Sequence, residues 1–100
     1  MASWDKLIAV YIMANRKNGT LYTGVTSDLL KRCWQHRTGV FEGFSKKWGC
    51  TKLVWFEPHD LIAEAIRREK SIKSYRRTNK INLIQRMNPN WRDLYFDLLE

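Results

Sequence analysis

The first half of the chain carries apolar runs of strand length, and the second half carries apolar residues at helical spacing. Residues 7–14 (LIAVYIMA) are apolar at consecutive positions, which predicts a strand buried on both faces of a sheet. Asn18 and Gly19 tolerate a positive φ and predict a turn over residues 15–19. Residues 20–26 (TLYTGVT) are rich in β-branched and aromatic side chains, so we expect them to return as the second strand of a hairpin.

The remaining pattern predicts mostly helices, with one more strand between them. Ser27 and Asp28 are typical of a helix N-cap, and Pro58 is expected to end the third strand. The segments expected after the hairpin are a helix to about Thr38, a loop over 39–50, a strand over 51–57 and helices over 61–74, 78–86 and 91–100. The order ββαβααα favours an α+β fold, a small three-stranded antiparallel sheet flanked by helices, because a doubly wound parallel sheet needs more βαβ crossovers.

The length and composition are those of an ordinary globular protein. One hundred residues (12.0 kDa) suffice for one core, so we expect a single domain over residues 1–100. No apolar run approaches the roughly 20 residues that cross a bilayer, and the five tryptophans are scattered, so no membrane role is expected. The beginning, MASWDK, lacks the apolar core of a secretory signal, which favours a cytoplasmic location.

The charge is strongly positive, with 18 Lys and Arg against 10 Asp and Glu and a net charge of +8. Nucleic acid is the first candidate partner for such a field, with an acidic membrane surface or an inert basic protein as alternatives. Residues 61–86 hold eight Lys and Arg against two Glu, which predicts a phosphate-binding surface or else a solvated helical face. The residues predicted to bind nucleic acid are Lys31, Lys46, Lys47, Arg67, Arg68, Lys70, Lys73, Arg76, Arg77 and Lys80.

Glu69 falls on the apolar side of the helix expected over residues 61–74. At 100° per residue it lies between Ala65 and Ile72 on one stripe. A buried carboxylate is costly without a cation, so we expect either a metal site here or a salt bridge to an Arg. The stripe consists of Leu61, Ile62, Ala65, Ile66 and Ile72.

Two further pairs of side chains are expected to share a face. Arg32 and His36 are four residues apart on the first helix and are therefore neighbours, as in an ordinary solvated face or in a site. In the hairpin, Tyr11 and Tyr22 are expected on the same side of the sheet, as packing residues or as reactive phenols. Gly24 lies on that side too, where it would let a ligand approach the backbone closely.

These positions together resemble the GIY-YIG nuclease family, and in particular its small single-domain subgroup, uncharacterised protein family 0213 (UPF0213). The resemblance spans nearly the whole chain. The family's Gly-Ile-Tyr is Ala-Val-Tyr here and its Tyr-Ile-Gly is Tyr-Thr-Gly, so both tyrosines are kept. The matching positions are Ala9-Val10-Tyr11, Tyr22-Thr23-Gly24, Arg32, His36, and Glu69 within REKSIK.

The resemblance implies a metal-dependent endonuclease that hydrolyses phosphodiester bonds in nucleic acid. DNA is expected more strongly than RNA, as a structured or single-stranded substrate in repair or recombination. Tyr22 would be the general base for an attacking water, with Tyr11 orienting that water or sharing the role. His36 would assist by hydrogen bonding or proton transfer. His36 is also a rival base, because an unperturbed imidazole has a pKa of about 6.5.

The same resemblance assigns the charge-stabilising groups. Arg32 would bind the scissile phosphate, and Glu69 would hold one Mg²⁺ (or Mn²⁺) ion. This is chemically reasonable because Mg²⁺ keeps several waters and accepts few protein ligands. A fixed Arg and a metal both stabilise the negative charge that builds during phosphodiester cleavage. Asn88 would help to position the site.

Two other functional classes fit the residues. One is a nucleic-acid-binding module whose site is non-catalytic or depends on a protein partner, because nucleases of this type often carry a separate targeting domain. The other is a basic interaction protein with no nucleic-acid role. The sequence does not specify the oligomeric state.

Overall fold

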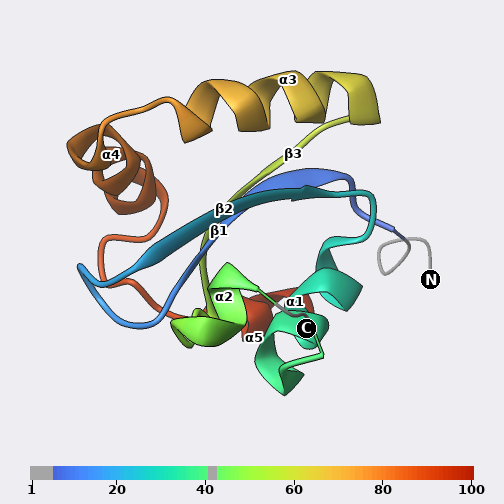
Figure 1. The fold of residues 1–100 in the computed structure, drawn as a ribbon. Helices are drawn as coiled ribbons and strands as arrows, with labels where there is room; N and C mark the ends of the chain where they lie inside the picture. The colour runs from blue at the N-terminus through green and yellow to red at the C-terminus, as the bar shows by residue number, and fades with distance from the viewer. Residues whose placement is uncertain (1–5, 41–42) are drawn as a thin grey trace.

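A three-stranded antiparallel sheet forms the centre of the computed structural model, which describes residues 6–40 and 43–100. The strand order is β2-β1-β3 (Figure 1). β1 (Ala9–Ala14) is the middle strand and is buried at every position, as its apolar run predicts. It pairs antiparallel with β2 (Leu21–Thr26) and β3 (Lys52–Pro58), so these two are the edge strands.

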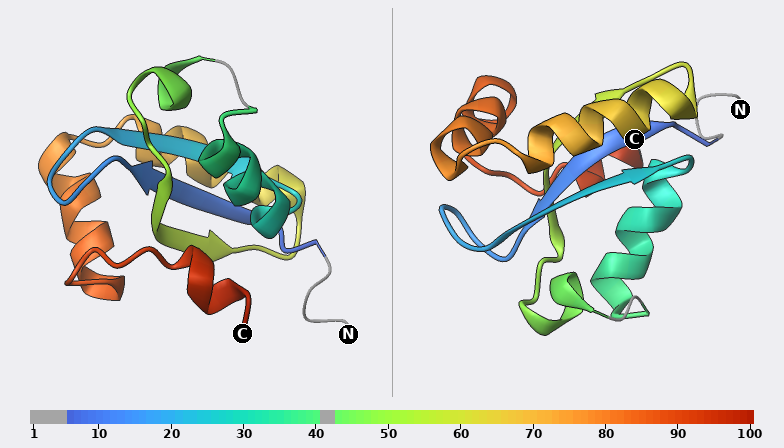
Figure 2. Two further views of the ribbon diagram at one scale, coloured as in Figure 1. Left: turned by 90° about the horizontal axis from the view of Figure 1, so that it is seen from below. Right: turned by 45° about the horizontal axis from the view of Figure 1, so that its top comes forward.

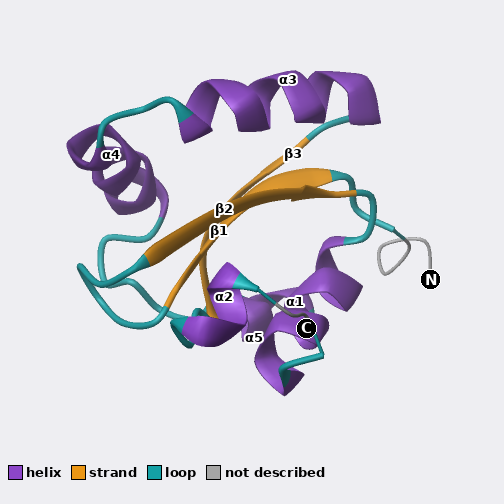
Figure 3. Ribbon diagram, in the orientation of Figure 1, coloured by secondary structure: helices purple, strands orange, loops and turns teal. Residues whose placement is uncertain are grey.

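Helices cover both faces of the sheet, as Figure 1 and Figure 3 show. Two of them, α3 and α4, lie on one face. The other three lie on the opposite face, and the two further views of Figure 2 show the same division. The helices are α1 (Leu29–Thr38), α2 (Phe44–Lys47), α3 (Ile62–Lys73), α4 (Arg77–Met87) and α5 (Tyr95–Leu98).

The core is divided by the sheet, because successive side chains of β1 point to opposite faces. Val10 and Ile12 pack with residues of α3 and α4, such as Ile72 and Ile84. Tyr11 belongs to the other cluster, which includes Cys33 of α1. Tyr11 is therefore placed on the α1 face of the sheet.

The α+β class and the predicted order of elements are confirmed, with two differences in detail. The loop expected over 39–50 contains α2, a single helical turn that is too short to show a periodic pattern; residues 41 and 42 of that loop lie outside the described residues. The terminal helix expected over 91–100 is shorter in the structure, where only α5 is helical. Trp91 has a φ of +56°, outside the helical range, and the helix starts after Leu94.

The apolar stripe predicted for α3 is correct only in part. Ala65 and Ile72 are fully buried, but Leu61 (59% exposed), Ile62 (41%) and Ile66 (38%) are not. The buried positions of α3 are Ala65, Glu69 and Ile72, which follow one narrow line along the helix. The helix thus buries only this narrow line, and the rest of the predicted stripe stays exposed.

Within residues 6–40 and 43–100, no helix combines the length and the apolar character that crossing a bilayer requires.

Candidate active site

A buried chain of three polar side chains joins β1, α1 and α2. The Tyr11 Oη atom lies 3.0 Å from His36 Nε2, and His36 Nδ1 lies 2.8 Å from Ser45 Oγ. All three side chains are buried. His36 points inward because it follows Leu29 and Cys33 on the buried side of α1. Ser45 carried no signal in the sequence, since its position depends on how the 39–50 segment folds back onto α1.

Tyr22 completes an aromatic group around this chain. The register pairs Tyr11 with Gly24 and Met13 with Tyr22, so the predicted shared face of Tyr11 and Tyr22 is confirmed. Their ring centroids are 6.3 Å apart, and the Tyr22 and His36 centroids are 5.2 Å apart. Tyr22 is only half-buried, so among these aromatic rings it is the one that solvent reaches.

Gly24 makes room for Tyr11 rather than for a ligand. A Cβ atom at this position would lie 2.5 Å from Tyr11 Oη and 2.6 Å from Tyr11 Cζ. The Tyr11 ring therefore lies directly over the Gly24 backbone on edge strand β2. The expected role of Gly24 in ligand approach is wrong, because the phenol already fills that space.

We expect Gly24→Ala to lower the free energy of unfolding by about 1–3 kcal/mol, because the added methyl group displaces the Tyr11 ring from a packed site. Urea denaturation of the variant and the parent protein measures this difference. The matched experiment repeats the substitution in a Tyr11→Ala background, where the cost of Gly24→Ala should largely disappear. An unchanged midpoint in the first comparison, or an equal cost in both backgrounds, contradicts the packing described here.

Burial keeps both Tyr11 and His36 neutral. The pKa of Tyr11 is raised above its ordinary value chiefly by burial, an effect that the nearby Arg32 charge only partly offsets. Burial and the positive charge of Arg32 lower the pKa of His36 to about 4. Arg32 acts on both groups, which places its guanidinium beside the Tyr11–His36 pair.

A neutral His36 imidazole carries one proton, so one of its ring nitrogens donates and the other accepts. Nε2 shares a hydrogen bond with the Tyr11 hydroxyl and Nδ1 shares one with Ser45 Oγ, and each hydroxyl can either donate or accept. Both ring nitrogens of His36 are engaged. This arrangement is suited to holding Tyr11 and Arg32 in place.

Glu69 lies on the other face of the sheet from this group. It belongs to α3, which packs over β2 and β1, and it is 9% exposed. Its Oε2 atom forms an ion pair of 2.7 Å with Lys73 Nζ, one helical turn further on. The predicted partner cation thus exists, but it is a Lys rather than an Arg. Tyr11, Tyr22, His36 and Arg32 are brought together, whereas Glu69 belongs to a helix on the opposite face of the sheet.

Asn88 is buried between α4 and α5, and its amide binds backbone. Its Nδ2 atom donates to Val54 O (3.2 Å) and Arg92 O (2.7 Å), and its Oδ1 atom accepts from Arg92 N (3.0 Å). These bonds attach the segment after α4 to strand β3.

The predicted nucleic-acid-binding cations divide into three groups. Three are already used inside the protein: Arg68 binds Glu57 and Tyr75, Lys73 binds Glu69, and Arg77 donates to two backbone carbonyls. Lys80 is half-buried and lines a cleft beside the hairpin turn. The remaining six, all exposed at the surface, are Lys31, Lys46, Lys47, Arg67, Lys70 and Arg76.

Comparison with known proteins decides the family. The GIY-YIG catalytic domain matches residues 7–82, a span that holds Tyr11, Tyr22, Arg32, His36 and Glu69. The chain belongs to the GIY-YIG family. The predicted resemblance is thereby confirmed, and Asn88 lies beyond the matched span.

The UPF0213 relatives support the same conclusion. This GIY-YIG protein is 38% identical over 68 residues to a UPF0213 protein of Staphylococcus saprophyticus, covering 68% of this chain and 83% of the relative. A UPF0213 protein of Staphylococcus epidermidis is 33% identical over 81 residues, covering 81% and 96%. The solution structure of a UPF0213 protein from Bacillus halodurans superposes with a TM-score of 0.54 at 28% identity, covering 86% of this chain and 90% of that chain.

Proposed function

We propose that this GIY-YIG protein is a metal-dependent endonuclease that hydrolyses phosphodiester bonds, with structured or single-stranded DNA as its substrate. The observation that carries the proposal is the buried Tyr11–His36–Ser45 chain, which holds Tyr11 and Arg32 beside a solvent-accessible Tyr22. The net charge of +8 supports a polyanionic substrate.

Tyr22 is the group we assign to activation of the attacking water. Tyr11 is neutral, buried and hydrogen-bonded, and His36 has a pKa of about 4 with both nitrogens engaged, so neither is well placed to accept a proton near pH 7. Tyr22, acting in its deprotonated form, would take the proton of a water aligned by Tyr11. His36 would then act through Tyr11, as a positioning residue.

Arg32 is assigned to the scissile phosphate. It is half-buried at the edge of α1 and lines a hollow of about 230 Å³ with Lys31 and Lys6. A guanidinium held in this position can donate two hydrogen bonds to nonbridging oxygens and stabilise the charge that develops on them.

Glu69 is assigned to the divalent metal ion, and Asn88 to positioning of the adjoining segment. Within the described part of the chain, no cluster of three or more His, Cys, Asp or Glu side chains could hold a metal ion. A single carboxylate is still compatible with Mg²⁺, which is commonly bound by one or two carboxylates together with waters and substrate phosphates. When bound, the ion would supply Lewis-acid stabilisation of the leaving oxygen. Lys73 Nζ pairs with one oxygen of the same carboxylate, Oε2, and would compete with the ion for it.

The test is cleavage by the purified protein of single-stranded, flapped, branched and fully paired DNA with Mg²⁺ or Mn²⁺. We expect metal-dependent nicking that Tyr22→Phe reduces by about 10²-fold or more, because general acid–base groups contribute on this scale. Tyr95→Phe is the matched control, since Tyr95 lies outside the site on α5. Absence of cleavage of every DNA and RNA form with any divalent metal refutes the enzyme proposal.

A second candidate is a nucleic-acid-binding module that needs a protein partner for activity. The Glu69–Lys73 ion pair favours it, because a paired carboxylate is less available to a metal ion. Salt-sensitive binding without turnover in the same assay would support this alternative.

A further inference from the structure

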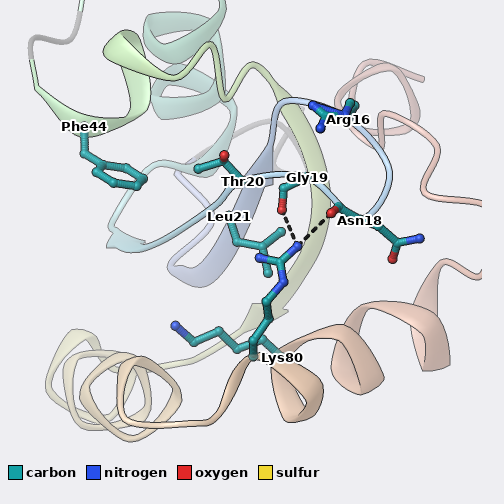
Figure 4. Close-up of a pocket in the computed structure, with 8 residues that line it drawn as sticks. Arg16, Asn18, Gly19, Thr20, Leu21, Phe44 and Lys80 are labelled. Carbon is teal, nitrogen blue, oxygen red and sulfur yellow. Dashed lines mark hydrogen bonds between the residues drawn. The ribbon is translucent and has the colours of Figure 1, made fainter.

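A cleft of about 440 Å³ lies between the β1–β2 hairpin turn and α4 (Figure 4). Its lining includes Arg16 from the turn, Arg77 and Lys80 from α4, and Phe44 from α2. None of the described residues that line it is acidic. In Figure 4, Phe44 and Lys80 stand on opposite sides of the opening, with Leu21 between them. The cleft therefore offers positive charge and one exposed aromatic ring.

The walls of this cleft are held together across a long sequence separation. Arg77 Nη2 donates to the carbonyl oxygens of Asn18 (2.8 Å) and Gly19 (2.6 Å), which fastens the turn to α4. The turn is itself rigid, because Thr20 N donates to Asn15 Oδ1 at 2.9 Å. A Cβ atom on Gly19 would lie 2.0 Å from that same oxygen, so the turn requires glycine there. The cleft is thus preformed, and Arg77 serves as its clamp.

The charge of Lys80 is available in the cleft. Lys80 is half-buried, and within the described part of the chain no carboxylate pairs with its ammonium group. Arg16 is exposed and likewise forms no ion pair among the described residues. Cations that line a hollow without partners are suited to phosphate oxygens, whose contacts release bound counterions.

The cleft is continuous with the candidate active site. The Phe44 ring stacks on Tyr22, with centroids 6.4 Å apart and an interplanar angle of 26°. Phe44 is 51% exposed, so part of its ring remains open to a ligand. At the other end of β2 lies the hollow that Arg32 and Lys31 line. Two basic hollows therefore flank Tyr22 along an edge strand of six residues, which spans about 20 Å.

We propose that the cleft binds an unpaired nucleotide next to the scissile phosphate, with its base stacked on Phe44 and its phosphate held by Lys80 and Arg16. A base can stack on a protein ring only when it has left its own stack, so the substrate class is nucleic acid with a single-stranded or splayed segment beside the cut. The inference deepens the proposed function. It rests on that function only for the claim that the bound nucleotide flanks the cut.

The first experiment measures binding of a fluorescent 12-nucleotide single strand of mixed sequence, by anisotropy in EDTA. Lys80→Ala should weaken binding about five- to tenfold at 50 mM salt and reduce the salt slope by about 0.7, the values expected for one lost phosphate contact. Lys17→Ala is the matched control, because Lys17 is exposed in the same turn but does not line the cleft. It should change affinity less than about twofold. Equal losses in the two variants would show a diffuse charge effect and overturn the cleft proposal.

The second experiment tests the stacked base. Phe44→Leu should weaken single-strand binding about fivefold or more and leave binding of a blunt duplex of the same sequence unchanged. Phe96→Leu is the matched control, since Phe96 is 53% exposed on α5 and outside the cleft. An unchanged ratio of single-strand to duplex affinity in Phe44→Leu overturns the proposal.

Cleavage by the unmodified protein is measured separately, so the two proposals can fail independently. Suppose that the unmodified protein cuts nothing, and that single-strand affinity falls in Lys80→Ala and Phe44→Leu but not in their control variants. This result would support the nucleotide site and refute the nuclease. If the unmodified protein cleaves nucleic acid but both variants keep its single-strand affinity, the nuclease is supported and the nucleotide site is refuted.

Discussion

Glu69→Gln is expected to reduce metal-dependent cleavage by about 10²–10³-fold while nucleic-acid binding in EDTA stays within about twofold of the parent protein. The amide keeps the size of the side chain but removes the charge that would hold a divalent ion. Glu69 is a buried position of α3, which packs on the face of the sheet opposite the aromatic group, so this substitution should leave that group intact. Initial cleavage rates over a Mg²⁺ titration, together with anisotropy binding, measure both effects.

Lys73→Met is the matched variant for this prediction. It removes the ammonium that pairs with Glu69 and leaves the carboxylate in place. We expect half-maximal cleavage at a lower Mg²⁺ concentration, because the ion no longer competes with Lys73 for the carboxylate. Parent-like cleavage by Glu69→Gln would refute the metal assignment.

Acidification from pH 7 to pH 4 is expected to remove about 3 kcal/mol of unfolding free energy through His36 alone. The pKa of His36 is about 4 in the folded protein, below the value of about 6.5 for an unperturbed imidazole. The unfolded chain therefore binds the proton first. The stabilisation is complete above pH 6.5 and is lost as the pH falls through the folded-state pKa. Urea denaturation at intervals of half a pH unit measures the slope.

His36→Gln should be less stable than the parent protein at pH 7 and should lose this part of the pH dependence. His59→Gln is the matched control, because His59 is half-buried beside Glu57 and outside the Tyr11 chain. It should keep the slope of the parent protein. The same pH slope in His36→Gln and in the parent would contradict the buried, neutral imidazole.

The two predictions concern side chains on opposite faces of the same sheet. The Tyr11–His36–Ser45 chain lies between the sheet and α1, and Glu69 lies between the sheet and α3. The sheet separates them, and Tyr22 of edge strand β2 lies on the same face as Tyr11. A nucleic-acid strand that follows this edge would meet Arg32, Tyr22 and the Phe44 cleft in turn.

Local periodicity was sufficient for much of this arrangement. The two-residue repeat of a strand is enough to place Tyr11 and Tyr22 on one face, and the observed register agrees. Asp28 caps α1 as its residue type predicts, accepting a hydrogen bond from Lys31 N. These features depend on neighbours along the chain, so a short segment contains the information that determines them.

Other expectations failed where neighbours in space decide the outcome. Leu61 and Ile66 satisfy the helical repeat but are exposed, because α3 contacts the sheet along a single line. Gly24 is reserved for the Tyr11 ring, which no spacing along the chain reveals. No spacing along the chain indicates that Arg77 also fastens a turn 58 and 59 residues away.

The order of residues thus specified the elements, the face that each tyrosine occupies and the excess of positive charge, since backbone geometry and composition settle these over a few residues. Packing between distant segments supplied the rest: the Ser45 partner of His36, the neutrality of both buried groups, and the cations that remain available to a ligand. The reason is that desolvation and ion pairing depend on three-dimensional surroundings, which are assembled from segments far apart along the chain.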